Sequence, residues 1–178
     1  MPEFDRIVGV DPSLTSTGIA LVEGGRFTAV ERVRTKLKGH QRVDHIVSRI
    51  LEVADSPVDT LVGIEGTAMG AKGAAVVQIF GLWGIITREL WKAGFRYYVV
   101  GPTTLKKYAT GSGAAGKDDV MTAVVRSYPD VDFTGNDMAD AMVIAAIGAR
   151  QHDAAIAGET KTKIQLETLG KVDWDHAG

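Results

Sequence analysis

The chain has 178 residues, of which 45% are hydrophobic and 24% charged, with a net charge of −2 and no cysteine. This composition is typical of one folded domain, and it excludes disulfides, thiolate metal sites and a uniformly basic nucleic-acid coat. The sequence shows no targeting signal and no apolar run of membrane-spanning length. We therefore expect a cytoplasmic protein with no membrane partner.

The first 35 residues predict an antiparallel sheet. A β-branched run at residues 7–10 ends in Asp11, a turn rich in Pro, Ser and Thr follows, and the apolar pattern resumes at residues 19–22. This pattern predicts a β-hairpin. A second turn and an alternating segment at residues 27–35 predict a third antiparallel strand.

Helices and strands then alternate along the chain. Apolar residues spaced three and four apart predict a helix at residues 39–54, and a compact apolar run at residues 59–65 predicts a strand that ends in Glu65. Residues 74–91 predict a helix that is apolar around most of its circumference. Such a helix is buried on more than one side, either inside the domain or against another subunit. A further strand is expected at residues 97–100.

The last part of the chain is mainly helical. A short helix is predicted to start at residues 103–107, and a glycine-rich loop at residues 110–116 precedes a helix at residues 118–127. A helix at residues 137–150 carries a stripe of small residues suited to close packing on a sheet. Residues 151–178 lose strong periodicity and are expected to form a partly ordered tail.

This order of elements predicts an α/β fold. Three antiparallel strands followed by strands that alternate with helices imply a mixed sheet, with later strands parallel and helices on both faces. We expect one domain over residues 1–150 and no interdomain linker.

Four carboxylates stand at positions that need an explanation. Asp11 and Glu65 each end a predicted strand, and Asp137 and Asp140 lie three residues apart at the start of the last helix, on one face. Local roles are one explanation, because a turn aspartate bonds backbone amides and acids at a helix start cap free amides. The other explanation is a metal site, because clustered carboxylates select Mg²⁺ or Mn²⁺. Two such ions about 4 Å apart can hold the attacking water and the leaving oxygen of a phosphodiester.

Basic residues are concentrated after the third predicted strand. The densest run comprises Arg32, Arg34, Lys36, Lys38 and Arg42. Such a run is usually a solvated face, but beside an acidic nuclease site phosphate contacts become the better interpretation. The loop before Lys117 is similar to a phosphate-binding loop, yet Asp118 follows where that motif requires Ser or Thr. We therefore expect no nucleotide cofactor.

Four motifs together resemble a known family. They are GVDPSLTSTGIALV, GIEGTAMG, LKKYATGSGAAGKDDV and NDMADAMVIA, in that order. Their order and spacing resemble those of the RuvC-type Holliday junction resolvases, the crossover junction endodeoxyribonucleases of the ribonuclease H-like superfamily, including phage-type members. Each motif alone is weak, but the four together are specific and span residues 6–150.

The resemblance implies a function and partners. It implies a ribonuclease H-like fold and a Mg²⁺-dependent endonuclease, with Mn²⁺ as a substitute, that resolves four-way DNA junctions in recombination and repair. It implies a homodimer with the long apolar helix at the interface, in a prokaryotic or phage-infected host cell. The alternatives are a ribonuclease H-like nuclease acting on other branched DNA or RNA, and a junction-binding protein without turnover.

The resemblance also implies roles for individual residues. The expected metal ligands are Asp11, Glu65, Asp137 and Asp140. Lys106 and Lys117 match the family's active-site lysines, although Lys107 lies next to the first of them. The expected DNA-binding residues are Arg32, Arg34, Lys36, Lys38, Lys72 and Lys107.

Overall fold

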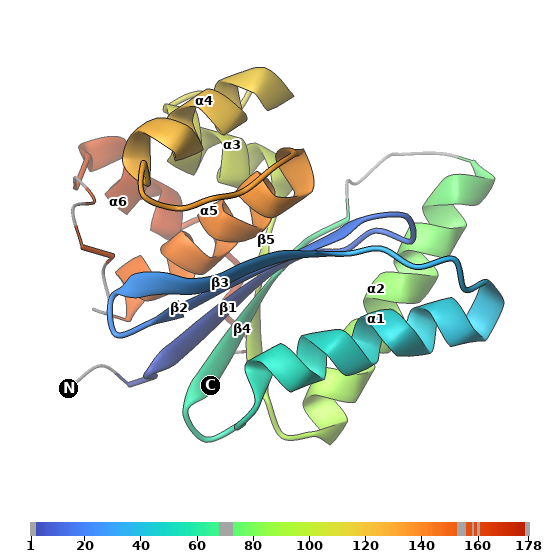
Figure 1. Cartoon of the computed structure of the whole chain (residues 1–178). Helices are drawn as coiled ribbons and strands as arrows, with labels where there is room; N and C mark the ends of the chain where they lie inside the picture. The colour runs from blue at the N-terminus through green and yellow to red at the C-terminus, as the bar shows by residue number, and fades with distance from the viewer. Residues whose placement is uncertain (1–2, 68–72, 153–155, 158, 160, 177–178) are drawn as a thin grey trace.

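The computed structural model describes residues 3–67, 73–152, 156, 157, 159 and 161–176 of the chain (Figure 1). Lys72, expected to bind DNA, lies outside the described residues. In the described part of the chain, no helix has both the length and the apolar character needed to cross a membrane.

One mixed sheet forms the centre of the fold. Its strands are β1 (Arg6–Asp11), β2 (Thr17–Glu23), β3 (Arg26–Val33), β4 (Thr60–Glu65) and β5 (Arg96–Val100). The strand order is β3-β2-β1-β4-β5, with β1, β2 and β3 antiparallel in sequence and β4 and β5 parallel to β1. The predicted α/β fold with a mixed sheet is thus confirmed.

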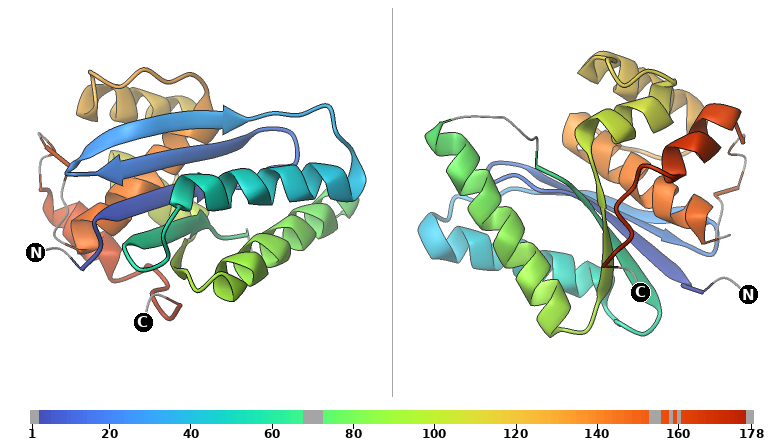
Figure 2. Two further views of the ribbon diagram at one scale, coloured as in Figure 1. Left: turned by 60° about the horizontal axis from the view of Figure 1, so that its bottom comes forward. Right: turned by 180° about the vertical axis from the view of Figure 1, so that it is seen from behind.

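Helices cover both faces of the sheet (Figures 1 and 2). One face carries α1 (Gly39–Ala54) and α2 (Ala74–Lys92), and the other carries α3 (Pro102–Thr110), α4 (Lys117–Ser127), α5 (Asn136–Gln151) and α6 (Lys163–Leu169). Each face has its own core, because alternate side chains of β1 point to opposite sides. Val8 and Val10 pack with α1 and α2, whereas Ile7 packs with α5.

Helix α5 lies directly against the sheet. It is buried along nearly its whole length, and glycines on the strands make room for it. A Cβ at Gly9 would overlap the backbone of Ala141, and a Cβ at Gly18 would overlap the carbonyl of Asp137. Because Gly18 is the β2 partner of Asp11, this close approach places the start of α5 beside the end of β1.

Helix α2 is buried on one face only. Leu82, Ile86 and Leu90 point into the core. Large apolar side chains elsewhere on α2 are exposed, namely Val77, Ile79, Phe80, Ile85 and Trp91. Of the two alternatives for this helix, burial on several sides inside the domain is therefore wrong.

The segment after α5 contains more structure than its sequence pattern indicated. Helix α6 was not anticipated, because seven residues are too few for a clear periodicity. Beyond α6 the backbone of Asp173 exchanges hydrogen bonds of 2.9 and 3.0 Å with Val99 and so covers part of the β5 edge. Trp174 packs on Tyr98 with ring centroids 4.7 Å apart. The last described residues therefore belong to the packed fold.

Candidate active site

Two predicted acids meet at one edge of the sheet. Because β1 and β4 are parallel neighbours, with Val10 opposite Ile64, their last residues Asp11 and Glu65 lie side by side. Strand alternation points both carboxylates to the face that α5 covers, the face of Ile7 and Leu61. The Asp11 and Glu65 side chains are close enough for each to affect the pKa of the other.

Asp140 joins these two acids from α5, and the three form what we call the acid cluster: Asp11, Glu65 and Asp140. Burial raises the pKa of Asp11 to about 10, with the charge of Glu65 as the next cause and that of Asp140 contributing. Burial and then Glu65 raise the pKa of Asp140 to about 7. Burial also raises the pKa of Glu65. The members of the acid cluster therefore resist ionising together.

Two lysines face the acid cluster from the helices that follow β5. The charges of Lys106, on α3, and Lys117, the first residue of α4, lower the pKa of both Glu65 and Asp140. The sequence left open whether Lys106 or Lys107 is the first lysine of the site. The charge of Lys106 acts on the acids, so the structure favours Lys106.

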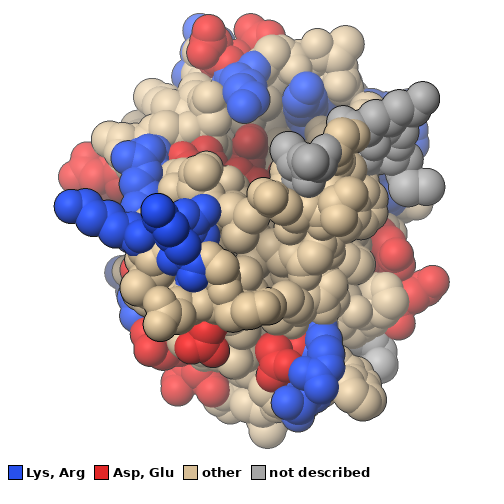
Figure 3. All heavy atoms as spheres, turned by 90° about the vertical axis from the view of Figure 1, so that its right-hand side faces the viewer, with Lys and Arg blue, Asp and Glu red and all other residues tan. Residues whose placement is uncertain are grey.

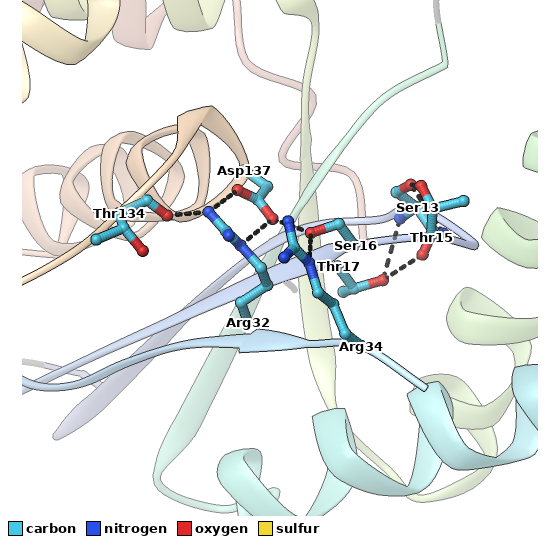
Figure 4. A network of polar contacts seen from close by, with 8 residues as sticks. All are labelled: Ser13, Thr15, Ser16, Thr17, Arg32, Arg34, Thr134 and Asp137. Carbon is cyan, nitrogen blue, oxygen red and sulfur yellow. Dashed lines mark hydrogen bonds and ion pairs between the residues drawn. The ribbon is translucent and has the colours of Figure 1, made fainter. Parts of the chain in front are cut away.

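The fourth predicted acid has a different partner. The Arg32 guanidinium contacts both carboxylate oxygens of Asp137, with Nη2 2.8 Å from Oδ1 and Nε 2.7 Å from Oδ2 (Figure 4). The Ser16 hydroxyl donates to Asp137 Oδ2, and Arg32 Nη2 also donates to the Thr134 carbonyl. Asp137 remains close enough for its charge to raise the pKa of Asp11 and Asp140. The structure thus brings three of the four predicted acids together and pairs the fourth with Arg32.

Sequence reasoning missed Ser16 and the pairing of Arg32. Ser16 stands 121 residues before Asp137, and Arg32 stands 105 residues before it. No local pattern links residues at such separations, so the sequence contained no signal for this contact. Arg32, expected to contact DNA, forms an ion pair with Asp137 in this structure.

The donor chemistry of the acid cluster fits a hard divalent cation. Among the described residues, no group of three His, Asp or Glu side chains is arranged so that it could hold a metal ion without some movement. Carboxylates without a cation repel one another, and here the charge of Glu65 raises the pKa of Asp11. A divalent cation would relieve this repulsion, and carboxylate oxygens are the ligands that Mg²⁺ and Mn²⁺ prefer.

Cations surround this region of the surface. Arg34, Lys36 and Lys38 are exposed in the segment that joins β3 to α1, and Arg34 Nε donates to Ser16 Oγ at 3.2 Å. Lys107 is half-buried on α3. Figure 3 shows Lys and Arg side chains around a recess in which acidic atoms lie. A polyanion could therefore approach the acids along a basic surface.

Comparison with known proteins shows which family this chain matches. Residues 7–148 match the family model described as crossover junction endodeoxyribonuclease RuvC. Curated proteins of that name from Hyphomonas neptunium and Hydrogenovibrio crunogenus are 29% and 28% identical to this chain. These matches cover 81% and 86% of this chain, and 90% of each relative.

Solved structures agree with the family match. The structure described as T. thermophilus RuvC in complex with Holliday junction substrate is similar with a TM-score of 0.67 and 26% identity, over 79% of this chain and 90% of that chain. A second Thermus thermophilus RuvC structure has the same fold, with a TM-score of 0.67 and 24% identity over 85% of this chain and 98% of that one. The chain belongs to the RuvC family of crossover junction endodeoxyribonucleases.

Proposed function

We propose that this chain is a metal-dependent, structure-selective DNA endonuclease that resolves four-way junctions, with residues 1–150 as the nuclease domain. The acid cluster carries the proposal, because buried carboxylates with raised pKa values, faced by two lysines, suit phosphodiester hydrolysis. Because its substrate is DNA, we expect the protein to act where the DNA lies, in the cytoplasm of a prokaryotic or phage-infected cell.

The acid cluster would hold the metal. We assign Asp11, Glu65 and Asp140 as ligands of Mg²⁺, for which Mn²⁺ can substitute. When bound, the metal supplies Lewis-acid charge and a more acidic water at the scissile phosphate. Asp11, at the end of a buried strand, fixes the position of the site relative to the sheet.

The two lysines act on the phosphate. Lys117 follows the glycine-rich loop and is exposed, so its ammonium can reach a bound phosphate. Lys106 is half-buried and held on α3. Both ammonium groups place positive charge where the phosphate gains negative charge in the transition state. The exposed Arg34, Lys36 and Lys38, together with Lys107, would contact the DNA backbone on either side.

A second copy of the chain would complete the enzyme. A four-way junction is resolved by cutting two strands at symmetric positions, which requires two active sites related by a two-fold axis. The apolar side of α2 that remains exposed, described above, supports this helix as the shared contact surface.

The proposal is tested with four substrates: a four-way junction, a Y-fork, a linear duplex and an RNA–DNA hybrid, each with Mg²⁺ and with EDTA. We expect cutting of the junction with Mg²⁺ and none with EDTA. Exclusive cutting of the hybrid would instead identify a ribonuclease acting on RNA. A junction gel shift without cutting in Mg²⁺ or Mn²⁺ would identify a binding protein without turnover.

Amide variants of the acid cluster sharpen this test. Asp11→Asn, Glu65→Gln and Asp140→Asn remove charge but keep shape, so each should slow junction cutting by at least about 100-fold. Junction binding in EDTA should persist or tighten, because a negative charge near the phosphates is lost. Asp132→Asn is the matched control, since Asp132 is an exposed acid in the loop before α5. Cutting by Asp11→Asn at the wild-type rate would exclude the assigned metal site.

A further inference from the structure

The ion pair between Arg32 and Asp137 lies at the border of the acid cluster. Arg32 comes from β3, and Asp137 comes from the first turn of α5. Arg32 Nη2 donates a hydrogen bond of 2.8 Å to Oδ1, and Nε lies 2.7 Å from Oδ2 as an ion-pair contact. The pair neutralises the charge of the carboxylate and restricts its orientation.

The surroundings of the pair are shaped to hold it. The Arg32 and Asp137 side chains are only 18% and 14% exposed, so water screens their attraction weakly. Gly135 has φ +89°, and a Cβ there would overlap the terminal Nη2 of Arg32, so the backbone leaves room for the guanidinium. Ser16 adds a hydroxyl donor to Asp137, and Arg34 in turn donates to Ser16 (Figure 4).

Asp137 is nevertheless near the acid cluster. It lies three residues before Asp140 on the same helix, so both point to the same side of α5. The Arg32 guanidinium already neutralises the Asp137 carboxylate and competes with a divalent cation for its oxygens. The position of Asp137 suits a metal ligand, but its contact with Arg32 opposes that role.

We propose that Arg32 is a positioning residue that holds Asp137 out of the metal site, so that the DNA-free protein binds metal through Asp11, Glu65 and Asp140. This inference rests on the proposed function and concerns one residue of the same site. Asp137 becomes a ligand only when its contact with Arg32 is broken. The metal site therefore has one form with three carboxylates and another that Asp137 joins, and Arg32 decides between them.

The test is a Mn²⁺ titration by calorimetry on the DNA-free protein, with wild type, Arg32→Gln, Asp137→Asn and the double variant. In the wild-type background, Asp137→Asn should change the Mn²⁺ affinity by at most about threefold, whereas Asp140→Asn should lower it at least about tenfold. Arg32→Gln should raise the affinity because it frees a carboxylate. In the Arg32→Gln background, Asp137→Asn should then lower the affinity at least about tenfold.

The cycle separates ligation from simple charge effects. If only net charge mattered, Asp137→Asn would have the same effect in both backgrounds, and that additive result would overturn the inference. A lower Mn²⁺ affinity of Arg32→Gln would also overturn it, because Arg32 would then be supporting the site. Arg49→Gln is the control: Arg49 also contacts both oxygens of one carboxylate at 2.7 Å, but that carboxylate is Glu31.

The outcomes also distinguish this inference from the proposed function. Mn²⁺ binding by the wild type that is lost in Asp140→Asn, together with additive effects of Arg32 and Asp137, would overturn the inference alone. A wild-type protein that binds no Mn²⁺ would contradict the metal site itself. Melting temperatures of all variants establish that each is folded at the titration temperature.

Discussion

Asp11 links the chemistry of the site to the stability of the protein. Its pKa is raised from an ordinary value of 3.8 to about 10, chiefly by burial. The unfolded chain therefore loses this proton near pH 4, whereas the folded metal-free protein keeps it until near pH 10. Between these values unfolding releases a proton, so the contribution of Asp11 to the free energy of unfolding falls as pH rises.

Asp11→Asn should therefore stabilise the metal-free protein at pH 8. We expect a melting temperature at least about 3 °C above wild type in EDTA at pH 8, which corresponds to about 1 kcal/mol. At pH 3 the two proteins should melt together, because the wild-type carboxyl is then largely neutral in both states. Equal melting temperatures at pH 8 would show that Asp11 is ionised without cost.

Lys117 should matter more to turnover than to binding. It is exposed at the start of α4, and its charge reaches Glu65 and Asp140. Lys117→Ala should slow junction cutting at least about 100-fold, comparable with the loss of one oriented donor. Junction affinity in EDTA should change by less than about threefold, which is a small part of the rate effect. An equal loss of affinity and rate would make Lys117 a phosphate contact.

At the scale of elements, a single buried acid ties the C-terminal segment to three helices. Glu159 Oε1 accepts hydrogen bonds from Tyr108 of α3 and from Tyr128 at the end of α4, each of 3.0 Å. Its other oxygen pairs with Arg150 of α5, and the two side chains are 3% and 2% exposed. Because α3 and α4 also carry Lys106 and Lys117, this contact helps fix the helices that present the lysines.

Glu159→Gln should be strongly destabilising, because it leaves the Arg150 charge without its carboxylate. We expect a loss of about 3 to 5 kcal/mol in the free energy of unfolding, measured by urea titration. Glu167→Gln, an exposed acid on α6, should change it by less than about 0.5 kcal/mol. Replacing both partners, as Arg150→Met with Glu159→Gln, should recover part of the loss. A cost below about 1 kcal/mol for Glu159→Gln would mean that the C-terminal segment is not anchored there.

At the scale of the whole molecule, the exposed apolar side chains of α2 form the surface proposed for assembly. Val77 is 73% exposed and Phe80 43% exposed on this helix. A Cβ at Gly81 or Gly84 would meet nothing within 4 Å, so the backbone of α2 is open to close approach by another helix. These features favour a contact between two copies of α2 across a two-fold axis.

We expect the wild type to sediment as a dimer at micromolar concentration and Phe80→Glu as a folded monomer. Val58→Glu is the control, because Val58 is 75% exposed but lies in the turn between α1 and β4. Trp83 is less suited to this test, since it is partly buried against the core and its replacement would disturb the fold. A wild-type protein that sediments as a monomer would contradict the proposed interface.

The sequence by itself determined the order of the elements and the sheet type. The strands and main helices were predicted because their apolar periodicities are local, and hairpin turns and strand–helix alternation restrict the topology. Asp11 and Glu65 could be found for the same reason, since each ends a strand and parallel neighbours bring their ends together. The small residues of α5 indicated that it packs on a sheet, but only the structure showed the face on which it lies and so brought Asp140 to these two acids.

Only the tertiary structure decided which partner each charged residue has. Asp137 lies on the predicted face of α5, but Arg32 reaches it from β3, 105 residues away, and separates its role from that of Asp140. Glu159 likewise acquires its role from Tyr108, Tyr128 and Arg150, which lie on different elements. Side chains of opposite charge attract wherever the fold brings them together, and this attraction leaves no periodic trace in the sequence.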